Sequence, residues 1–513
     1  MYRGKDWKEL IRVISAPLLA LISFALYFST LAPGVTGFDS AELSSGVYTL
    51  GIVHPTGYPL YLLLGKLFSL LVTVRDLAFR LNLMSACFAA LTVFFIFKVI
   101  FKLTGNLLAA WIASVFLVIS SHFWQMAIVA EVYTLHTFFL ALNLFLLLKW
   151  RETGRFAYLF AFSFAFGLSL ANHVSGGLFL PAYLWLALYG RTGLIKNWKH
   201  CLYCGGFFLV GLLPYLYLPI RSLASPELDY VRTYYNVDLT TLKGLFWMIS
   251  GKAYGYFAFG YSLSEIPGEV ARLARFLWRD FFGVGVLLAF FGLVADWQKT
   301  WKLKVGLLLI FLANALFFIN YRVIDKDTMF LPCYLITALF IGEGVAALFA
   351  WLGVLQHKRV FPAWVKTATA SILALAVLLG GLLNYSWLDM SQETDQEIVI
   401  REVLSSAAPN STIISQWSSA VILEYYQTVE GLRPDLKIIN RSRINAAQYY
   451  KYWAQHFDHK SIMEKISQQE LDFVNNEIKQ RNVYIIEYDP LYLRRFEYIP
   501  QENYFRLSVV NQK

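Results

Sequence analysis

Long apolar runs separated by short polar segments occupy the first three quarters of the chain. Each run approaches the roughly 20 residues that an α-helix needs to cross the hydrocarbon core of a bilayer. We identify about eleven such runs, among them residues 13–32, 79–101, 107–122, 281–296, 329–351 and 366–387. The pattern predicts a polytopic α-helical membrane protein.

The pattern changes in the last quarter, where hydrophobicity drops and helical and extended segments alternate. Residues 411–414, 436–439 and 483–486 are short apolar runs typical of strands. We therefore predict two parts, a membrane region over residues 1–387 and a small soluble α/β domain over residues 388–513.

Basic residues between the apolar runs predict the orientation of the chain. Arg3, Lys5, Lys8 and Arg12 precede the first run, and basic residues recur within 149–155, 191–199, 299–304 and 357–359. Because such residues stay on the cytoplasmic side, we place the N-terminus there. The first run is long and lacks an obvious cleavage site, so we interpret it as a signal anchor. We expect the plasma membrane of a bacterium rather than the endoplasmic reticulum.

This orientation puts a first loop (residues 33–78), a long loop (residues 221–280) and the C-terminal domain on the extracytoplasmic side. In the first loop the sequence predicts two short helices, one beginning near Asp39 and one near Tyr58. We expect both helices to lie along the outer membrane surface.

Composition agrees with a membrane protein. The chain is 58% hydrophobic and only 15% charged, with mean hydropathy +0.51, whereas soluble proteins carry about 25% charged residues. The net charge of +10 comes from the short basic loops, and no basic tract interleaved with aromatic residues indicates a nucleic-acid partner. Cys201 and Cys204 have the spacing of a metal-binding pair, but no second pair accompanies them.

The polar residues that stand out are predicted at the outer ends of the spans or in outer loops. They are Asp39, Glu42, His54, His122, Glu131, His173, Arg221, Arg322, Asp325 and Asp327. Ionisable groups at a membrane edge are costly and are candidates for function. Their concentration on one side predicts an active cavity at the outer surface.

Asp39 has two compatible interpretations. Asp39 followed by Glu42 is a capping-box-like pattern, in which Asp39 caps the helix beginning at Ser40. A carboxylate beside an apolar wall also has a raised pKa and can act as a general base. Asp39, Glu42 and a histidine could also coordinate a divalent cation, although no spacing requires one.

The histidines and Glu131 each have a structural and a functional interpretation. His54 lies in the turn His-Pro-Thr-Gly-Tyr-Pro, where it either bonds the backbone or contacts a phosphate or sugar. The same two roles apply to His173. Glu131 is either a buried hydrogen-bond partner or a substrate contact.

Two outer arginines are candidates for binding phosphate. Arg221 and Arg322 either extend along the membrane interface or use the guanidinium fork to bind a phosphate. Asp325 and Asp327 flank Lys326, so they either form surface ion pairs or belong to the site.

No nucleotide-binding signature such as GxxxxGK[ST] or GxGxxG occurs in a supporting context. An activated substrate would therefore be carried by a lipid phosphate. The main alternative is a transporter or flippase of lipid-linked sugars, although we find neither inverted repeats nor paired broken helices. A third is a lipid-linked-sugar binding protein without turnover.

Several segments together resemble a known family. They are Thr36–Leu43, Leu50–Tyr61, Ala130–Leu135, Asn172–His173, Tyr217–Ser222 and Tyr321–Asp325. They resemble the membrane proteins of glycosyltransferase family 117, whose eukaryotic members are protein O-mannosyltransferases.

The resemblance implies a GT-C fold and inverting transfer of a sugar, with mannose expected, from a polyprenyl-phosphate donor. The acceptor is expected to be a hydroxyl of a protein Ser/Thr or of a glycan. Asp39 is then the expected base, and Glu42 and Tyr58 are expected substrate-site residues. The loop Pro226–Tyr230 departs from the Asn-Trp-Gly-like segment typical of the family, which leaves the acceptor open.

Overall fold

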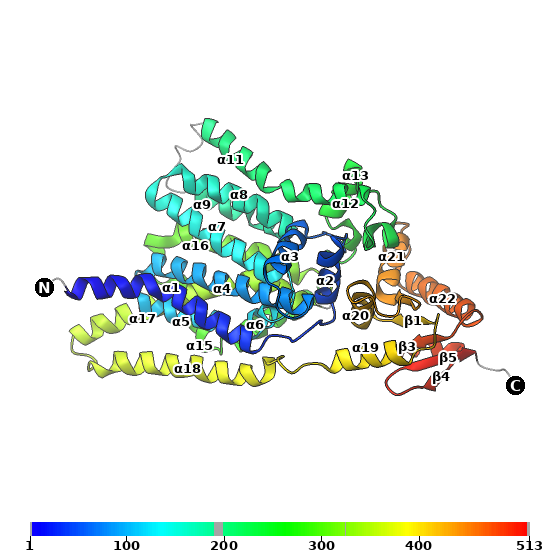
Figure 1. Ribbon diagram of the computed structural model, residues 1–513. Coiled ribbons are helices and arrows are strands. Elements are labelled where there is room, and N and C mark those ends of the chain that lie inside the picture. The colour runs from blue at the N-terminus through cyan, green and yellow to red at the C-terminus, as the bar shows by residue number, and fades with distance from the viewer. Residues whose placement is uncertain (1–2, 189–197, 324, 510–513) are drawn as a thin grey trace.

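The protein is described by a computed structural model over residues 3–188, 198–323 and 325–509. Arg191 and Lys196, two of the basic residues used to orient the chain, lie outside the described residues. In Figure 1 the long helices run alongside one another, and the strands lie beyond one end of them. The N-terminus lies at the opposite end of these helices.

The membrane region is built mainly from apolar helices, most of which lie in the predicted runs, although α14 is polar and lies in the predicted outer loop. The helices are α1 (Arg3–Ser29), α4 (Leu77–Thr104), α5 (Leu107–Val118), α6 (Ser121–Ala127), α7 (Tyr133–Thr153), α8 (Phe156–Asn172), α9 (Leu180–Leu188), α11 (Trp198–Gly211), α12 (Tyr217–Leu223), α14 (Ile266–Asp280), α15 (Val284–Val294), α16 (Trp297–Ile319), α17 (Leu331–His357) and α18 (Trp364–Leu388). Within the described residues, seven helical segments are long and apolar enough to cross a membrane, or nine if each of two bent pairs is one span. The polytopic helical fold is thus confirmed.

Two of the predicted runs differ in shape from a straight span. The run near residues 281–296 is only the 11-residue helix α15, about 16 Å long against a hydrocarbon core of about 30 Å. It follows α14 with a bend of 106°. The segments Phe156–Asn172 and Val174–Leu188 are apolar but also shorter than a full span.

Glycines allow α15 and α17 to pack at backbone contact. A Cβ on Gly292 would lie 2.0 Å from the carbonyl oxygen of Phe340, and a Cβ on Gly344 would lie 1.9 Å from that of Leu288. Neither glycine has room for a side chain, because the atoms in the way are backbone. Small residues at helix contacts are typical of membrane helices, which gain from close van der Waals packing.

The first outer loop contains α2 (Asp39–Thr49) and α3 (Pro59–Leu71). The prediction that both lie on the membrane surface is wrong for α2, because every residue from Asp39 to Val47 is buried. The helix is enclosed by α3, by α4 and by α20 (Trp417–Thr428) of the C-terminal region. In contrast, α3 exposes Leu63, Leu67, Leu70 and Leu71.

The C-terminal region is a five-stranded sheet with helices. Its elements are α19 (Asp395–Ser406), β1 (Thr412–Ser415), α20, β2 (Lys437–Asn440), α21 (Arg441–Trp453), α22 (His459–Ile478), β3 (Val483–Ile485), β4 (Phe496–Pro500) and β5 (Phe505–Val509). The strand order is β2-β1-β3-β5-β4, parallel across the first three strands and antiparallel across the last three. The three predicted strands are confirmed, and β4 and β5 are additional.

The outer-loop segment 221–280 contains α12, a π-helical turn (Val231–Tyr235), α13 (Leu242–Ile249) and α14. Two backbone hydrogen bonds join this segment to the first loop. Ile52 donates its N–H to the carbonyl of Leu228, and Tyr230 donates its N–H to the carbonyl of Ile52. The long loop therefore closes over the turn that follows α2.

We expect Gly344→Ala to destabilise the protein, because the new methyl group must displace the backbone of α15. Overpacking of this kind costs about 1–3 kcal/mol. The measurement is thermal unfolding of detergent-solubilised protein by tryptophan fluorescence. The matched control is Gly205→Ala on α11, where a Cβ meets no atom within 4 Å. An unchanged melting temperature for Gly344→Ala would contradict the close α15–α17 packing.

Candidate active site

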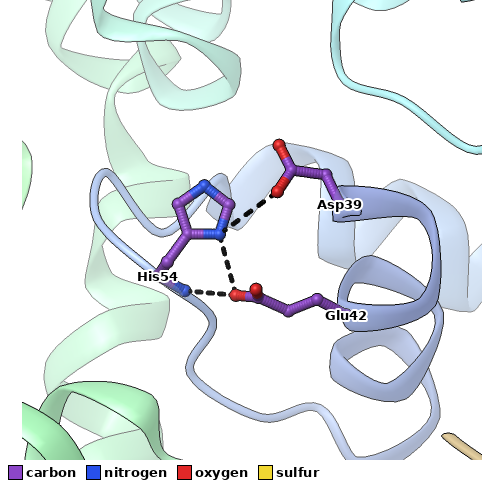
Figure 2. A group of neighbouring side chains, drawn as sticks. All are labelled: Asp39, Glu42 and His54. Atoms are coloured by element: carbon purple, nitrogen blue, oxygen red, sulfur yellow. Dashed lines mark hydrogen bonds and ion pairs between the residues drawn. The ribbon is translucent and has the colours of Figure 1, made fainter. Parts of the chain in front are cut away.

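Asp39, Glu42 and His54 form a buried cluster (Figure 2). The two carboxylates are three residues apart on α2, so both lie on one face of the helix. His54 comes from the turn between α2 and α3 and points its ring at them. Its Nδ1 lies 2.8 Å from Oε1 of Glu42 and 3.7 Å from Oδ1 of Asp39, and its backbone N–H donates to the same Glu42 oxygen over 2.7 Å.

The backbone around the cluster is unusual. Phe38, Leu50 and Tyr58 have φ angles of +59°, +48° and +43°, a region that side chains other than glycine rarely adopt. Phe38 and Leu50 flank the two ends of α2, and Tyr58 directly precedes α3. Such strain persists only where the surrounding packing imposes it, and it is often found at functional sites.

The capping interpretation of Asp39 is wrong. Asp39 is already the first residue of α2, Phe38 is the N-cap, and no side chain caps the helix. The Asp39 side chain points toward His54 instead (Figure 2). Its Oδ1 is buried and accepts no hydrogen bond from any part of the chain that the structure describes. The carboxylate is therefore free to accept a proton.

The C-terminal region supplies a residue that the sequence analysis did not identify. Arg443, in the first turn of α21, forms an ion pair with Oε2 of Glu42 through Nη2. Its Nη1 donates to the hydroxyl of Tyr254 over 3.2 Å. Its guanidinium also lies 4.8 Å from the ring centre of Trp417. No local motif indicates this role, because Arg443 and Glu42 are 401 positions apart.

Close packing joins the first outer loop to the C-terminal region. A Cβ on Gly37 would lie 2.1 Å from the hydroxyl of Ser418. The neighbouring Phe38 packs edge-on against Trp417, with ring centres 5.4 Å apart. A side chain at position 37 would have to displace Ser418, so α20 lies directly against the start of α2.

The two carboxylates have different proton affinities. Burial, together with the charges of Glu42 and Asp325, raises the pKa of Asp39 to about 6, against the opposing charges of His54 and Arg443. Burial also raises the pKa of Glu42, but the adjacent Arg443 and His54 lower it more, to about 2. Burial lowers the pKa of His54, whereas Glu42 and Asp39 raise it above its ordinary value overall. The cluster therefore pairs an ionised Glu42 with a histidine that favours the protonated form.

Three other predicted site residues lie in the same neighbourhood. Tyr58 bonds Nε2 of His54 through its hydroxyl over 3.0 Å, and its ring stacks on His173 with centres 5.8 Å apart. Glu131 is buried, and its Oε2 has no hydrogen-bond partner in the described ranges. Burial, together with the charges of Asp39 and Asp325, raises the pKa of Glu131 well above its usual range.

The two arginines predicted as phosphate ligands make other contacts. Arg221 donates to the carbonyls of Leu50 and Thr49, at the C-terminal end of α2. Arg322 is exposed and pairs with Glu265 over 3.4 Å. Both have structural partners, and neither touches Asp39, Glu42 or His54.

The outer aspartates have different roles. Asp325 is exposed and acts on Asp39 through its charge. Asp327 forms the predicted kind of surface ion pair, with Arg272 over 2.9 Å. His122, also among the predicted outer groups, belongs to a separate cluster with Asp280, at 2.6 Å.

The acidic residues and His54 fit a cation site poorly. One ligand atom from each of Asp39, Glu42 and His54 lies within 4.8 Å of the others. However, the two oxygens of Glu42 already face Nδ1 of His54 and the guanidinium of Arg443. A metal ion would have to displace Arg443 and break the contact between Glu42 and His54, and histidine binds metals only when neutral.

Replacing Asp39 is expected to stabilise the protein at neutral and alkaline pH. Because the pKa of Asp39 is raised in the folded state, the contribution of this residue to stability is complete below about pH 4. That contribution is lost as the pH rises through about 6. We therefore expect Asp39→Asn to melt at a higher temperature than the wild type near pH 8. The difference should disappear toward pH 4. A less stable variant near pH 8 would mean that attraction to His54 outweighs burial.

Comparisons with known proteins agree with this architecture. Residues 39–195 match the family described as the Protein O-mannosyl-transferase TMEM260 N-terminal domain. The chain is 26% identical over 459 residues to Protein O-mannosyl-transferase TMEM260 of Mus musculus, and 25% identical over 482 residues to the corresponding protein of Dictyostelium discoideum. These alignments cover 84% and 83% of this chain but 63% and 57% of the two relatives.

Solved structures of a bacterial membrane protein share the fold. ArnT from Cupriavidus metallidurans in the apo state aligns with a TM-score of 0.57, over 98% of both chains, at 12% sequence identity. The structure of ArnT bound to undecaprenyl phosphate aligns with a TM-score of 0.54 over the same shares of the two chains. At this identity the likeness extends to the fold alone.

Proposed function

Because this chain belongs with the protein O-mannosyl-transferases and has a GT-C-type membrane fold, we propose that it is an inverting glycosyltransferase. It transfers a sugar, with mannose the first candidate, from a polyprenyl-phosphate donor to an acceptor hydroxyl. The observation that carries the proposal is Asp39, a buried carboxylate with one unpartnered oxygen beside an imidazole. The cluster and the C-terminal region then lie on the extracytoplasmic side.

Asp39 is the general base of the proposed reaction. The acceptor oxygen attacks the anomeric carbon, its proton passes to Asp39, and the bond between that carbon and the phosphate oxygen breaks. A base is most effective when its pKa is near the working pH. With a pKa of about 6, Asp39 is ionised near pH 7 yet still basic enough to take a proton.

Glu42 and Tyr58 keep His54 in a fixed orientation. Nδ1 of His54 lies 2.8 Å from Oε1 of Glu42, and Nε2 lies 3.0 Å from the hydroxyl of Tyr58. The same Nδ1 lies 3.7 Å from Oδ1 of Asp39. A positive charge on this ring lowers the pKa of Asp39, because an opposite charge favours the deprotonated form.

Glu131 is suited to bind a hydroxyl of the transferred sugar. Burial raises the pKa of its carboxyl group well above its usual range and so favours the protonated form, which has both a donor and an acceptor. Its Oε2 is buried without a partner in the described residues, and buried polar groups are normally hydrogen-bonded. A sugar hydroxyl would satisfy this group.

The names of the curated relatives support a polypeptide acceptor. Aromatic side chains that suit a peptide or sugar lie between the long outer loop and α21. The ring of Tyr256 lies 4.7 Å from that of Tyr449 and 6.1 Å from that of Trp453. We assign this aromatic surface, Tyr256, Tyr449 and Trp453, to the acceptor.

We expect Asp39→Asn to lose roughly 10²–10⁴-fold in kcat, the usual contribution of a general base. The donor KM should change little, because asparagine keeps the size of the side chain. The assay is sugar transfer from synthetic polyprenyl-phosphate mannose by purified protein. Asp389→Asn, at the exposed end of α18, is the control and should keep full activity. Full activity of Asp39→Asn would assign the base to another residue.

The pH profile tests the same residue independently. We expect kcat/KM to fall below about pH 6, where Asp39 becomes protonated. Asp325→Asn should move this acid limb to lower pH, because it removes a negative charge that raises the pKa of Asp39. Asp327→Asn should leave the limb in place, since Asp327 is paired with Arg272. An acid limb unmoved by Asp325→Asn would argue against Asp39 as the titrating group.

A further inference from the structure

The proposed reaction creates a new negative charge on the departing phosphate. The donor is a phosphodiester with one negative charge, and the released lipid is a phosphomonoester that gains a second. A nearby cation that meets this charge lowers the barrier. The arginines that the sequence suggested, Arg221 and Arg322, are bound elsewhere.

We propose that Arg443 of the C-terminal region binds the phosphate of the lipid donor. This inference rests on the proposed function and names the ligand of a residue to which the sequence assigned no role. Arg443 is only 8% exposed and lies in the Asp39–Glu42–His54 cluster. It contributes a permanent positive charge to that cluster, in contrast to the titratable His54.

Arg443 has a hydrogen-bond donor that is unused. Nη2 faces Glu42 and Nη1 donates to Tyr254, but Nε has no acceptor within the described parts of the chain. Buried donors without partners are rare in folded proteins. A phosphate oxygen is a strong acceptor for a guanidinium N–H.

Trp417 provides a second unused donor in the same place. Its Nε1–H is buried and also lacks an acceptor among the described residues. The guanidinium of Arg443 lies 4.8 Å from the centre of this ring. Two neighbouring buried donors therefore face no protein acceptor, and both come from the C-terminal region. An oxyanion of the donor can satisfy both.

The charge balance of the reaction agrees with this position. The electron pair of the broken bond goes to the phosphate oxygen, and the acceptor proton goes to Asp39. One negative charge therefore disappears at Asp39 while another appears on the phosphate. The total charge of the site does not change, but one negative charge moves from Asp39 to the phosphate, which lies beside Arg443 in this proposal.

The C-terminal region holds Arg443 in place from its backbone. The side chain of Asn440 caps α21 by accepting the backbone N–H of Arg443 over 3.2 Å. Ser442 accepts the backbone N–H of Trp417 over 3.0 Å and donates to Gln416 over 2.7 Å. These bonds join the start of α20, which carries Trp417, to the start of α21, which carries Arg443, and so fix the two unused donors relative to each other.

The test is equilibrium binding of undecaprenyl phosphate to the full chain in detergent, measured by microscale thermophoresis. We expect Arg443→Gln to weaken binding roughly 10–100-fold, the usual effect of losing a charged hydrogen bond. The matched control is Arg441→Gln, two residues away on the same helix. Arg441 pairs with Glu470 and Asp489, so this variant should bind as the wild type does. Equal binding by wild type and Arg443→Gln would overturn the proposal.

Loss of Arg443 also leaves Glu42 without its partner, which could disturb folding. The double variant Glu42→Gln/Arg443→Gln removes both charges, so the net charge of the cluster stays the same. We expect it to melt near the wild-type temperature yet still to bind undecaprenyl phosphate as weakly as Arg443→Gln. Recovery of wild-type binding in the double variant would mean that Arg443 acts only by neutralising Glu42, and the proposal would fail.

Sugar transfer separates this inference from the proposed function. If the wild type binds undecaprenyl phosphate through Arg443 but transfers no sugar, the proposed function fails and the phosphate site stands. If the wild type transfers sugar and Arg443→Gln keeps the donor KM and lipid binding, the phosphate site fails alone. A raised donor KM in Arg443→Gln, with an unchanged KM in Arg441→Gln, supports both the proposed function and the phosphate site.

Discussion

The buried negative charge of Glu42 is the interaction on which the rest of the site depends. This side chain is fully buried and meets His54 through one oxygen and Arg443 through the other. Burying an ion is expensive unless it is paired and hydrogen-bonded. The pairing joins α2 and the turn that follows it to the start of α21, 401 positions away from Glu42. Removing either partner would leave an uncompensated charge in the interior.

The properties of Asp39 follow from this arrangement. Because Glu42 holds the imidazole and the guanidinium, Asp39 keeps a 3.7 Å approach to His54, and its Oδ1 has no hydrogen-bond donor among the described residues. Burial then dominates and raises the pKa of Asp39, while that of Glu42 falls. Two carboxylates on one helix face thus differ in pKa because their surroundings differ.

The same ion pair explains why α2 is enclosed. A helix carrying two carboxylates would be expected at the water-facing surface, yet α20 covers it through the tight contact at Gly37. Arg443 can reach Glu42 only if the C-terminal region packs directly on the first outer loop. The membrane region and the α/β region therefore build the site together. In our proposal, the first loop provides the base, and the C-terminal region provides the residue that binds the phosphate.

The sequence by itself determined the helices, because a bilayer requires long apolar runs whatever they pack against. It also determined the β1, β2 and β3 strands, and the neighbourhood of Asp39 and Glu42, since a spacing of three places both on one helix face. Only the tertiary structure decided that Asp39 is not a helix cap, that Arg221 binds the end of α2, and that Arg443 reaches Glu42. The reason is physical. Local patterns report which face of an element is apolar, whereas the partner of a buried charge depends on which distant segment packs against it.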